Sequence, residues 1–156
     1  MAQNKSSGGF WEELGNLVTG NGWKTDAELH PSQSVIDKDK VANYMDAHAN
    51  GTGNYGGHCA TACRKGLEAG GLNTTGHPVD AKDYGPFLTK HGAAAVSVDG
   101  YKPEKSDVAV FQGGGRNRSG HIEIYDGKQW VSDTKQPRFE PRRDYPGSSE
   151  IYRFPD

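Results

Sequence analysis

Apolar side chains recur at helical spacing through the N-terminal part of the chain, up to Gly92. This spacing predicts helices at residues 7–18, from Ser34 to about His48, from about His58 to Ala69, and from Asp80 to about His91. Ser7 and Ser34 are candidate N-caps. The pair Gly70-Gly71 and Gly92 are the expected C-terminal stops of the last two helices.

The pattern changes beyond Gly92, where short segments with alternating or β-rich character follow one another. They predict strands at residues 93–98, 107–111, 120–127, 129–133 and 150–154. Turn-like linkers join them, including Asp99-Gly100 and Asp126-Gly127. Helices followed by strands favour an α+β fold with an antiparallel sheet. The length fits a single domain over residues 1–156.

Composition and charge exclude several functional classes. The 156 residues carry a net charge of −2, so no global basic surface for nucleic acid is expected. No apolar stretch approaches the roughly 20 residues that span a bilayer, so no membrane insertion is expected. The N-terminal stretch has no apolar h-region, and we therefore expect a protein made in the cytoplasm without a signal peptide. No cofactor is expected.

Both cysteines of the chain lie in the segment GGHCATACRKGLEAGG, residues 56–71. A metal site, a disulfide, buried packing and a nucleophile are the four possible roles. The spacing of Cys59 and Cys63 matches zinc pairs poorly, and no second pair of ligands follows at a useful distance, so no metal is expected. Two cysteines four residues apart on a helix also lie too far apart for a good disulfide.

The two thiols are expected to differ in role. Cys63 shares the inward stripe of its helix with Leu67, which favours buried packing. Cys59 lies in the first turn, directly after a glycine pair, where free backbone N–H groups and the helix dipole are expected to lower the thiol pKa. The same N–H groups can hold an oxyanion. Cys59 is therefore the predicted nucleophile.

A nucleophilic thiolate needs a base and a group that orients the base. His121 opens a predicted strand, and Asp133 ends the next one. A tight turn centred on Gly127 would pair positions summing to about 254, which places His121 opposite Asp133. His58 is a second-choice base, because its side chain should diverge from that of Cys59.

Three stretches now resemble the NlpC-type and CHAP branch of the papain-like cysteine peptidases, whose members cut amide bonds in peptidoglycan. They are HCATACRKGLEAGG, KSDVAVFQ and SGHIEIYDGKQWVSD, and the resemblance covers about residues 55–134. AKDYGPFLTKHG is similar to the small single-domain amidases of this superfamily. The chain departs from the family at Ser106, where glycine is usual, and at Cys63, where an aliphatic or aromatic residue is usual.

The resemblance implies a papain-like fold of the NlpC/CHAP type, with N-terminal helices packed on a C-terminal antiparallel sheet and the nucleophile at a helix N-terminus. It implies a cysteine amidase or endopeptidase acting on peptidoglycan stem peptides through Cys59, His121 and Asp133. The expected substrate-contacting residues are Tyr55, Gly57, His58 and Arg116. Simple packing explains Tyr55 equally well, and an ordinary hairpin loop explains Arg116.

Small amidases without signal peptides resemble two biological types. One is the type VI secretion amidase effector, which acts in the periplasm or cell wall of a target bacterium and is opposed by a cognate immunity protein. The other is a phage endolysin of the same chemistry. We expect the first, with peptidoglycan, an immunity protein and the secretion apparatus as partners. A catalytically silent wall-binding or protein-binding module is the alternative from another class.

Overall fold

The computed structural model describes residues 35–53 and 57–156, which lie within the compact unit Ser32–Asp156. The predicted helix at residues 7–18, the N-cap Ser34 and the substrate-contact candidate Tyr55 are outside the described residues. The two other predicted helices before residue 70 are present. They are α2 (Lys38–His48) and α3 (Cys59–Ala69).

Local capping explains where these helices begin and end. α2 begins later than predicted, because its N-cap is Asp37 and not Ser34: the Asp37 carboxylate accepts a hydrogen bond of 3.1 Å from the backbone N–H of Lys40. α3 ends at Gly70, as predicted. The helix predicted from Asp80 is divided into a 3₁₀ turn, η1 (Ala81–Asp83), and α4 (Tyr84–Lys90). Pro86 favours this division, because proline fits the first turn of an α-helix but not its interior.

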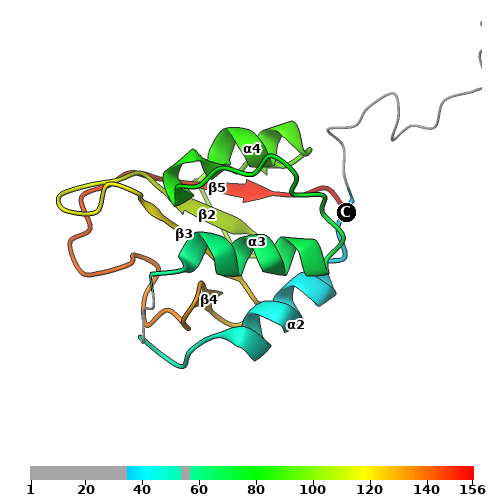
Figure 1. Cartoon of the computed structure of the whole chain (residues 1–156), viewed down its shortest axis with the longest axis horizontal. Helices are drawn as coiled ribbons and strands as arrows, with labels where there is room; N and C mark the ends of the chain where they lie inside the picture. The colour runs from blue at the N-terminus through cyan, green and yellow to red at the C-terminus, as the bar shows by residue number, and fades with distance from the viewer. Residues whose placement is uncertain (1–34, 54–56) are drawn as a thin grey trace, which may run out of the picture. The chain divides into compact units, whose positions relative to one another are not determined.

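The strands form one five-stranded sheet (Figure 1). They are β1 (Ala94–Ala95), β2 (Val108–Phe111), β3 (His121–Tyr125), β4 (Trp130–Val131) and β5 (Ser149–Arg153). Their order is β1-β5-β2-β3-β4, and every neighbouring pair is antiparallel. The α+β prediction is confirmed, although β1 and β4 are shorter than the segments predicted for them.

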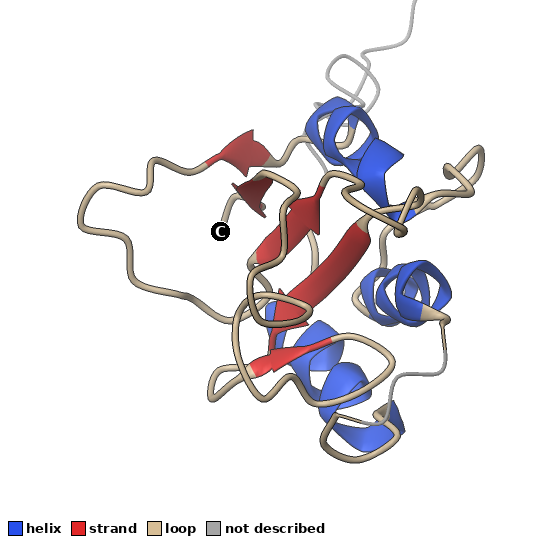
Figure 2. Cartoon of the chain, turned by 90° about the vertical axis from the view of Figure 1, so that its left-hand side faces the viewer, coloured by secondary structure: helices blue, strands red, loops and turns tan. Residues whose placement is uncertain are grey.

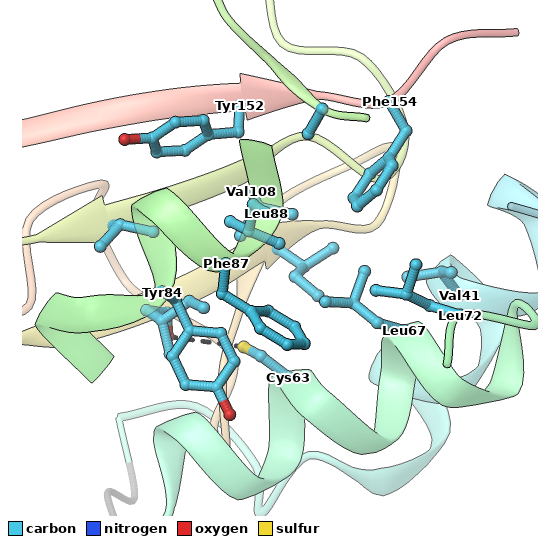
Figure 3. Packing of buried hydrophobic residues seen from close by; sticks show 14 of the residues in the cluster. Val41, Cys63, Leu67, Leu72, Tyr84, Phe87, Leu88, Val108, Tyr152 and Phe154 are labelled. Carbon is cyan, nitrogen blue, oxygen red and sulfur yellow. Dashed lines mark hydrogen bonds between the residues drawn. The ribbon is translucent and has the colours of Figure 1, made fainter. Parts of the chain in front are cut away.

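The helices cover one face of the sheet, and loops cover the other (Figure 2). Because successive strand side chains point to opposite faces, β2 and β3 contribute to two clusters. Val108 (Figure 3), Val110 and Ile122 belong to the cluster that packs with the helices, while Ala109 and Phe111 belong to the cluster beneath the loops. The two central strands are consequently buried on both faces.

The Ser-Asp pair that precedes β2 has a structural role. Asp107 is fully buried, and its carboxylate accepts two hydrogen bonds of 2.8 Å from the guanidinium of Arg153 and one of 2.6 Å from the Tyr101 hydroxyl. Ser106 has φ +73°, a left-handed conformation that explains why glycine is usual here in the family that the sequence resembles. Its hydroxyl donates to the carbonyl of Lys38 at 2.8 Å and so ties this turn to α2.

Candidate active site

Cys59 is the first residue of α3, and the helix start is held from outside. The N-cap residue, His58, makes no side-chain cap; its backbone N–H donates instead to Oδ2 of Asp133 at 3.0 Å. Gly57 precedes it with φ +77°, and a side chain added there would meet only open space. The approach to Cys59 along the backbone is therefore unobstructed at Gly57.

The two cysteines lie against the backbone of the same residue of β3, Ile122. The backbone N–H groups of Ile122, Ala60 and Cys59 itself lie close to the Cys59 sulfur and favour its thiolate form. Cys63 is fully buried, and its thiol donates to the carbonyl of Ile122 at 3.5 Å. Figure 3 shows the Cys63 sulfur pointing into the apolar cluster that includes Tyr84. Cys63 is thus a core residue, while Cys59 is only partly buried.

The prediction that the helix start lowers the thiol pKa of Cys59 is wrong. Burial raises this pKa, and the nearby charge of Asp133 raises it further. The three backbone N–H groups act in the opposite direction, but they do not outweigh the loss of hydration. The resting thiol is therefore protonated at neutral pH.

His121 is fixed at the start of β3 by the glycine before it. Gly120 has φ +74°, and a Cβ there would lie 2.2 Å from the carbonyl oxygen of Phe111. The side chain of Asn117 holds Gly120 through two hydrogen bonds, of 3.1 Å to its carbonyl and 3.0 Å from its N–H. Close packing of the backbone therefore requires glycine at the position directly before His121.

The imidazole of His121 is nearly buried. Burial lowers its pKa to about 4, while the charge of Asp133 and a hydrogen bond with the Gln136 side chain favour the protonated form. On the same strand face, Nε2 of His121 lies 3.3 Å from Oε1 of Glu123. The phenyl ring of Phe111 lies on the facing strand, with its centroid 5.8 Å from that of the imidazole.

The predicted register that set Asp133 opposite His121 is wrong by one residue. Tyr125 pairs with Trp130, because the Asp126 side chain accepts hydrogen bonds from the backbone N–H groups of residues 128 and 129 and shifts the centre of the turn. The ladder then ends after Val131, where the chain turns back and pairs with Lys135. Asp133 lies in this turn, beyond the strand.

Asp133 nevertheless acts electrostatically on both other residues of the predicted triad. Its charge acts on the pKa of Cys59 and on that of His121, and its carboxylate holds the first residues of α3. The turn after β4, and not the hairpin ladder, therefore brings the charge of Asp133 near Cys59 and His121. Ser132 supports the arrangement. Its hydroxyl can donate to Oδ1 of Asp133, at 3.1 Å, or to Oε1 of Gln136, at 2.8 Å.

Two polar neighbours of His121 were missed in the sequence. Gln136 follows the predicted strand and gave no periodic signal. Glu123 carried a signal that was not used, because residues two apart on a strand share a face and Glu123 therefore had to lie beside His121.

Arg116 lies outside this junction, at the tip of a small hairpin closed by Gly114 and Asn117. It is exposed and, with Arg142, lines a cavity of about 580 Å³. Tyr145 lies beside Arg142: the guanidinium of Arg142 lies 5.6 Å from the Tyr145 ring centre, and burial raises the pKa of Tyr145. Sequence reasoning did not identify Tyr145.

A second cavity, of about 310 Å³, lies between α2 and the start of α3. Its walls include Tyr44, His58, Lys65 and Asp133. His58 is exposed there.

Two general features complete the description of residues 35–53 and 57–156. No helix in these ranges is long and apolar enough to cross a membrane. In the same part of the chain, no group of three or more His, Cys, Asp or Glu side chains is arranged to hold a metal ion.

Two solved structures resemble the chain, whereas no family model and no curated protein matches it. Both are crystal structures of the type VI effector–immunity complex Tae3–Tai3 from Ralstonia pickettii. In the selenomethionine form the matched chain is 35% identical, with a TM-score of 0.66, and the match covers 73% of this chain and 99% of that one. In the native form the identity is 32% and the TM-score 0.66, and the match covers 76% of this chain and 98% of that one.

Such identity over nearly the whole matched chain, with the same arrangement of helices and sheet, shows common ancestry. The chain belongs to the Tae3 family of type VI effectors.

Proposed function

We propose that this effector is a cysteine amidase of the papain-like NlpC/CHAP class, which hydrolyses amide bonds in the stem peptides of peptidoglycan. The observation that carries the proposal is the position of the Cys59 thiol. It lies at the start of a helix, against the backbone of the residue that follows His121, with the charge of Asp133 acting on both side chains. In amide hydrolysis of this kind the thiol is the nucleophile and the imidazole is the general base. The carboxylate orients the imidazole and stabilises the imidazolium.

In the proposed reaction the resting thiol and imidazole are both neutral, since burial raises the pKa of Cys59 and lowers that of His121. His121 takes the thiol proton as Sγ forms a bond to the amide carbon. The backbone N–H groups of Cys59 and Ala60, which now point at the sulfur, are the candidate donors to the oxyanion.

Collapse of this intermediate breaks the C–N bond, and His121 gives its proton to the leaving amine. A water molecule, deprotonated by His121, then cleaves the thioester and restores the thiol. The Asp133 carboxylate favours the imidazolium in both halves, because its charge raises the pKa of His121.

The proposed substrate groove runs from Cys59 past Tyr145 toward the arginine cavity. The ring contacts that run from His121 through Phe111 to Tyr145, and the contact of Tyr145 with Arg142, support this path. Arg116 and Arg142 give the far end two guanidinium groups, which suit the carboxylates of D-Glu or diaminopimelate.

The test compares the two cysteines on purified peptidoglycan sacculi, with products identified by mass spectrometry. Cys59→Ala should abolish cleavage. Cys63→Ala is the matched control and should retain most of the activity while losing stability, because it only truncates a buried side chain. Loss of cleavage in Cys63→Ala with survival in Cys59→Ala would reverse the assignment, and cleavage by neither wild type nor variants would refute the amidase proposal.

The proposed place of action is the periplasm of a target bacterium, after delivery by a type VI secretion system. The similarity to the Tae3–Tai3 complex supports a cognate immunity protein as partner. Directing the protein to the periplasm of a test bacterium should stop growth, whereas cytoplasmic expression should be harmless. Equal growth under both conditions, with an active purified enzyme, would contradict the proposed site of action.

A further inference from the structure

Glu123 is an acidic side chain enclosed in the middle of the sheet. It lies on β3, is fully buried, and pairs across the ladder with Ala109 of β2. Within the described part of the chain, neither of its carboxyl oxygens has a hydrogen-bond partner. A buried carboxyl without such a partner is costly and uncommon, so its retention calls for a specific role.

The polar atom that faces this carboxyl belongs to the proposed general base. Oε1 of Glu123 lies 3.3 Å from Nε2 of His121. The two residues are two apart on one strand and therefore share a face, so the contact is imposed by the backbone. The separation is within reach of a hydrogen bond after a small rotation of either side chain.

The other charged and titratable groups around this pair come from three further segments. Glu140, in the segment after β4, acts on Glu123 and opposes its ionisation. Asp133, in the turn after β4, acts on His121. From α3, the Cys59 thiol lies near the backbone N–H of Ile122, and the Cys63 thiol donates to the carbonyl of the same residue and has its pKa raised by burial and, to a lesser extent, by the charge of Glu123.

We propose that Glu123 is a positioning residue for His121, whose carboxyl accepts a hydrogen bond from Nε2–H and stabilises the imidazolium that forms when Cys59 gives up its proton. This inference rests on the proposed cysteine chemistry, and it assigns to the site a second carboxyl besides Asp133. The two acids reach the ring from different elements.

The chemistry of the pair follows from its burial. Burial raises the pKa of the Glu123 carboxyl well above its usual range, so the carboxyl is neutral while the imidazole is neutral. A positive ring 3.3 Å away favours release of the carboxyl proton to water, and the resulting carboxylate in turn favours the positive ring. Protonation of His121 and ionisation of Glu123 are therefore coupled.

The test is the rate at which iodoacetamide alkylates Cys59 in the full chain between pH 5 and 9, followed by mass spectrometry of the Cys59 peptide. Alkylation requires the thiolate, so its rate reports the thiolate–imidazolium pair without any substrate. Glu123→Gln keeps the shape and an accepting oxygen but cannot become charged. It should slow alkylation at pH 7 about tenfold and move the midpoint of the rate profile about one pH unit higher.

Two controls separate this role from a structural one. Glu140→Gln, which changes an exposed neighbour of Glu123, should leave the alkylation rate within about twofold of wild type. In a His121→Gln background, Glu123→Gln should have no further effect, because the imidazole through which it acts is absent. Should Glu123→Gln fail to fold, Glu123→Asp, which keeps the charge but withdraws it from the ring, should give a smaller shift in the same direction.

Each outcome bears on one proposal. An unchanged alkylation profile for a folded Glu123→Gln protein overturns the positioning role. The role is also overturned if Glu123→Gln slows alkylation as much in the His121→Gln background as in the wild type. Peptidoglycan cleavage is measured on the same samples. If the wild type does not cleave sacculi but its alkylation profile still depends on Glu123, the proposed function fails and the positioning role stands.

Discussion

Acid should destabilise this protein through a single buried imidazole. Folding lowers the pKa of His121 from an ordinary value of 6.5 to about 4, because the ring is removed from water. As the pH falls through this interval, the unfolded chain binds a proton that the folded chain does not. The free energy of unfolding therefore decreases as the pH falls from about 6.5 to about 4.

The size of the effect follows from the two pKa values. At about 1.4 kcal/mol for each pH unit between them, the loss between pH 7 and pH 4 is about 3 kcal/mol. That is a large part of the roughly 5–15 kcal/mol that stabilises a typical domain. Glu123 acts in the opposite sense, because its folded pKa is raised and its contribution declines as the pH rises above its unfolded value.

The assay is urea unfolding, followed by circular dichroism, of the wild type and of His121→Gln at pH 7 and pH 4. Glu123 is present in both proteins, and its coupling to His121 matters little here because the folded imidazole is neutral over most of this interval, so the comparison reports chiefly the imidazole. Between pH 7 and pH 4, the free energy of unfolding should decrease by about 3 kcal/mol more in the wild type than in the variant. Equal losses would show that the ring is hydrated in solution, and the reasoning about its burial would then be refuted.

Two further predictions concern the turn before β2, and both are measured by unfolding. Asp107→Asn should reduce the free energy of unfolding in urea by about 3 kcal/mol, because it leaves the guanidinium of Arg153 without its buried carboxylate. The matched control, Glu104→Gln, alters an exposed partner of the same guanidinium and should reduce the free energy of unfolding by less than about 1 kcal/mol. Ser106→Ala should be about 1 kcal/mol less stable than Ser106→Gly, since both lose the hydrogen bond to Lys38 but only alanine keeps a side chain at φ +73°. Equal midpoints of thermal unfolding for the two Ser106 variants would contradict the second prediction.

The helical part of the fold followed closely from local signals. The apolar stripe of α3 and the glycine after it set this helix to within one residue of its predicted bounds. Such features act within a few residues along the chain, so a sequence displays them directly. The division of the last helix at Tyr84 also had a local cause, the proline two residues later, whose effect on the helix start was not considered.

The residues of the candidate site were expected to lie near one another, but the geometry that joins them was not predicted. His121 and Asp133 were identified as neighbours, yet the pairing that was expected to join them is displaced by the Asp126 turn. The pKa of Cys59 was misjudged because dipoles and N–H groups can be inferred from a helix start, whereas burial depends on strands distant in sequence. The contact of Glu123 with His121 was implied by strand alternation alone.

The sheet order has a consequence for biosynthesis. β5 is the last of the strands to leave the ribosome, yet it lies between β1 and β2. Until residues 149–153 have emerged, β2 presents an open edge one strand away from His121. A nascent polypeptide therefore cannot close its sheet around the proposed catalytic residues, and translation arrest or truncation before this point should yield an inert, aggregation-prone product rather than a toxin.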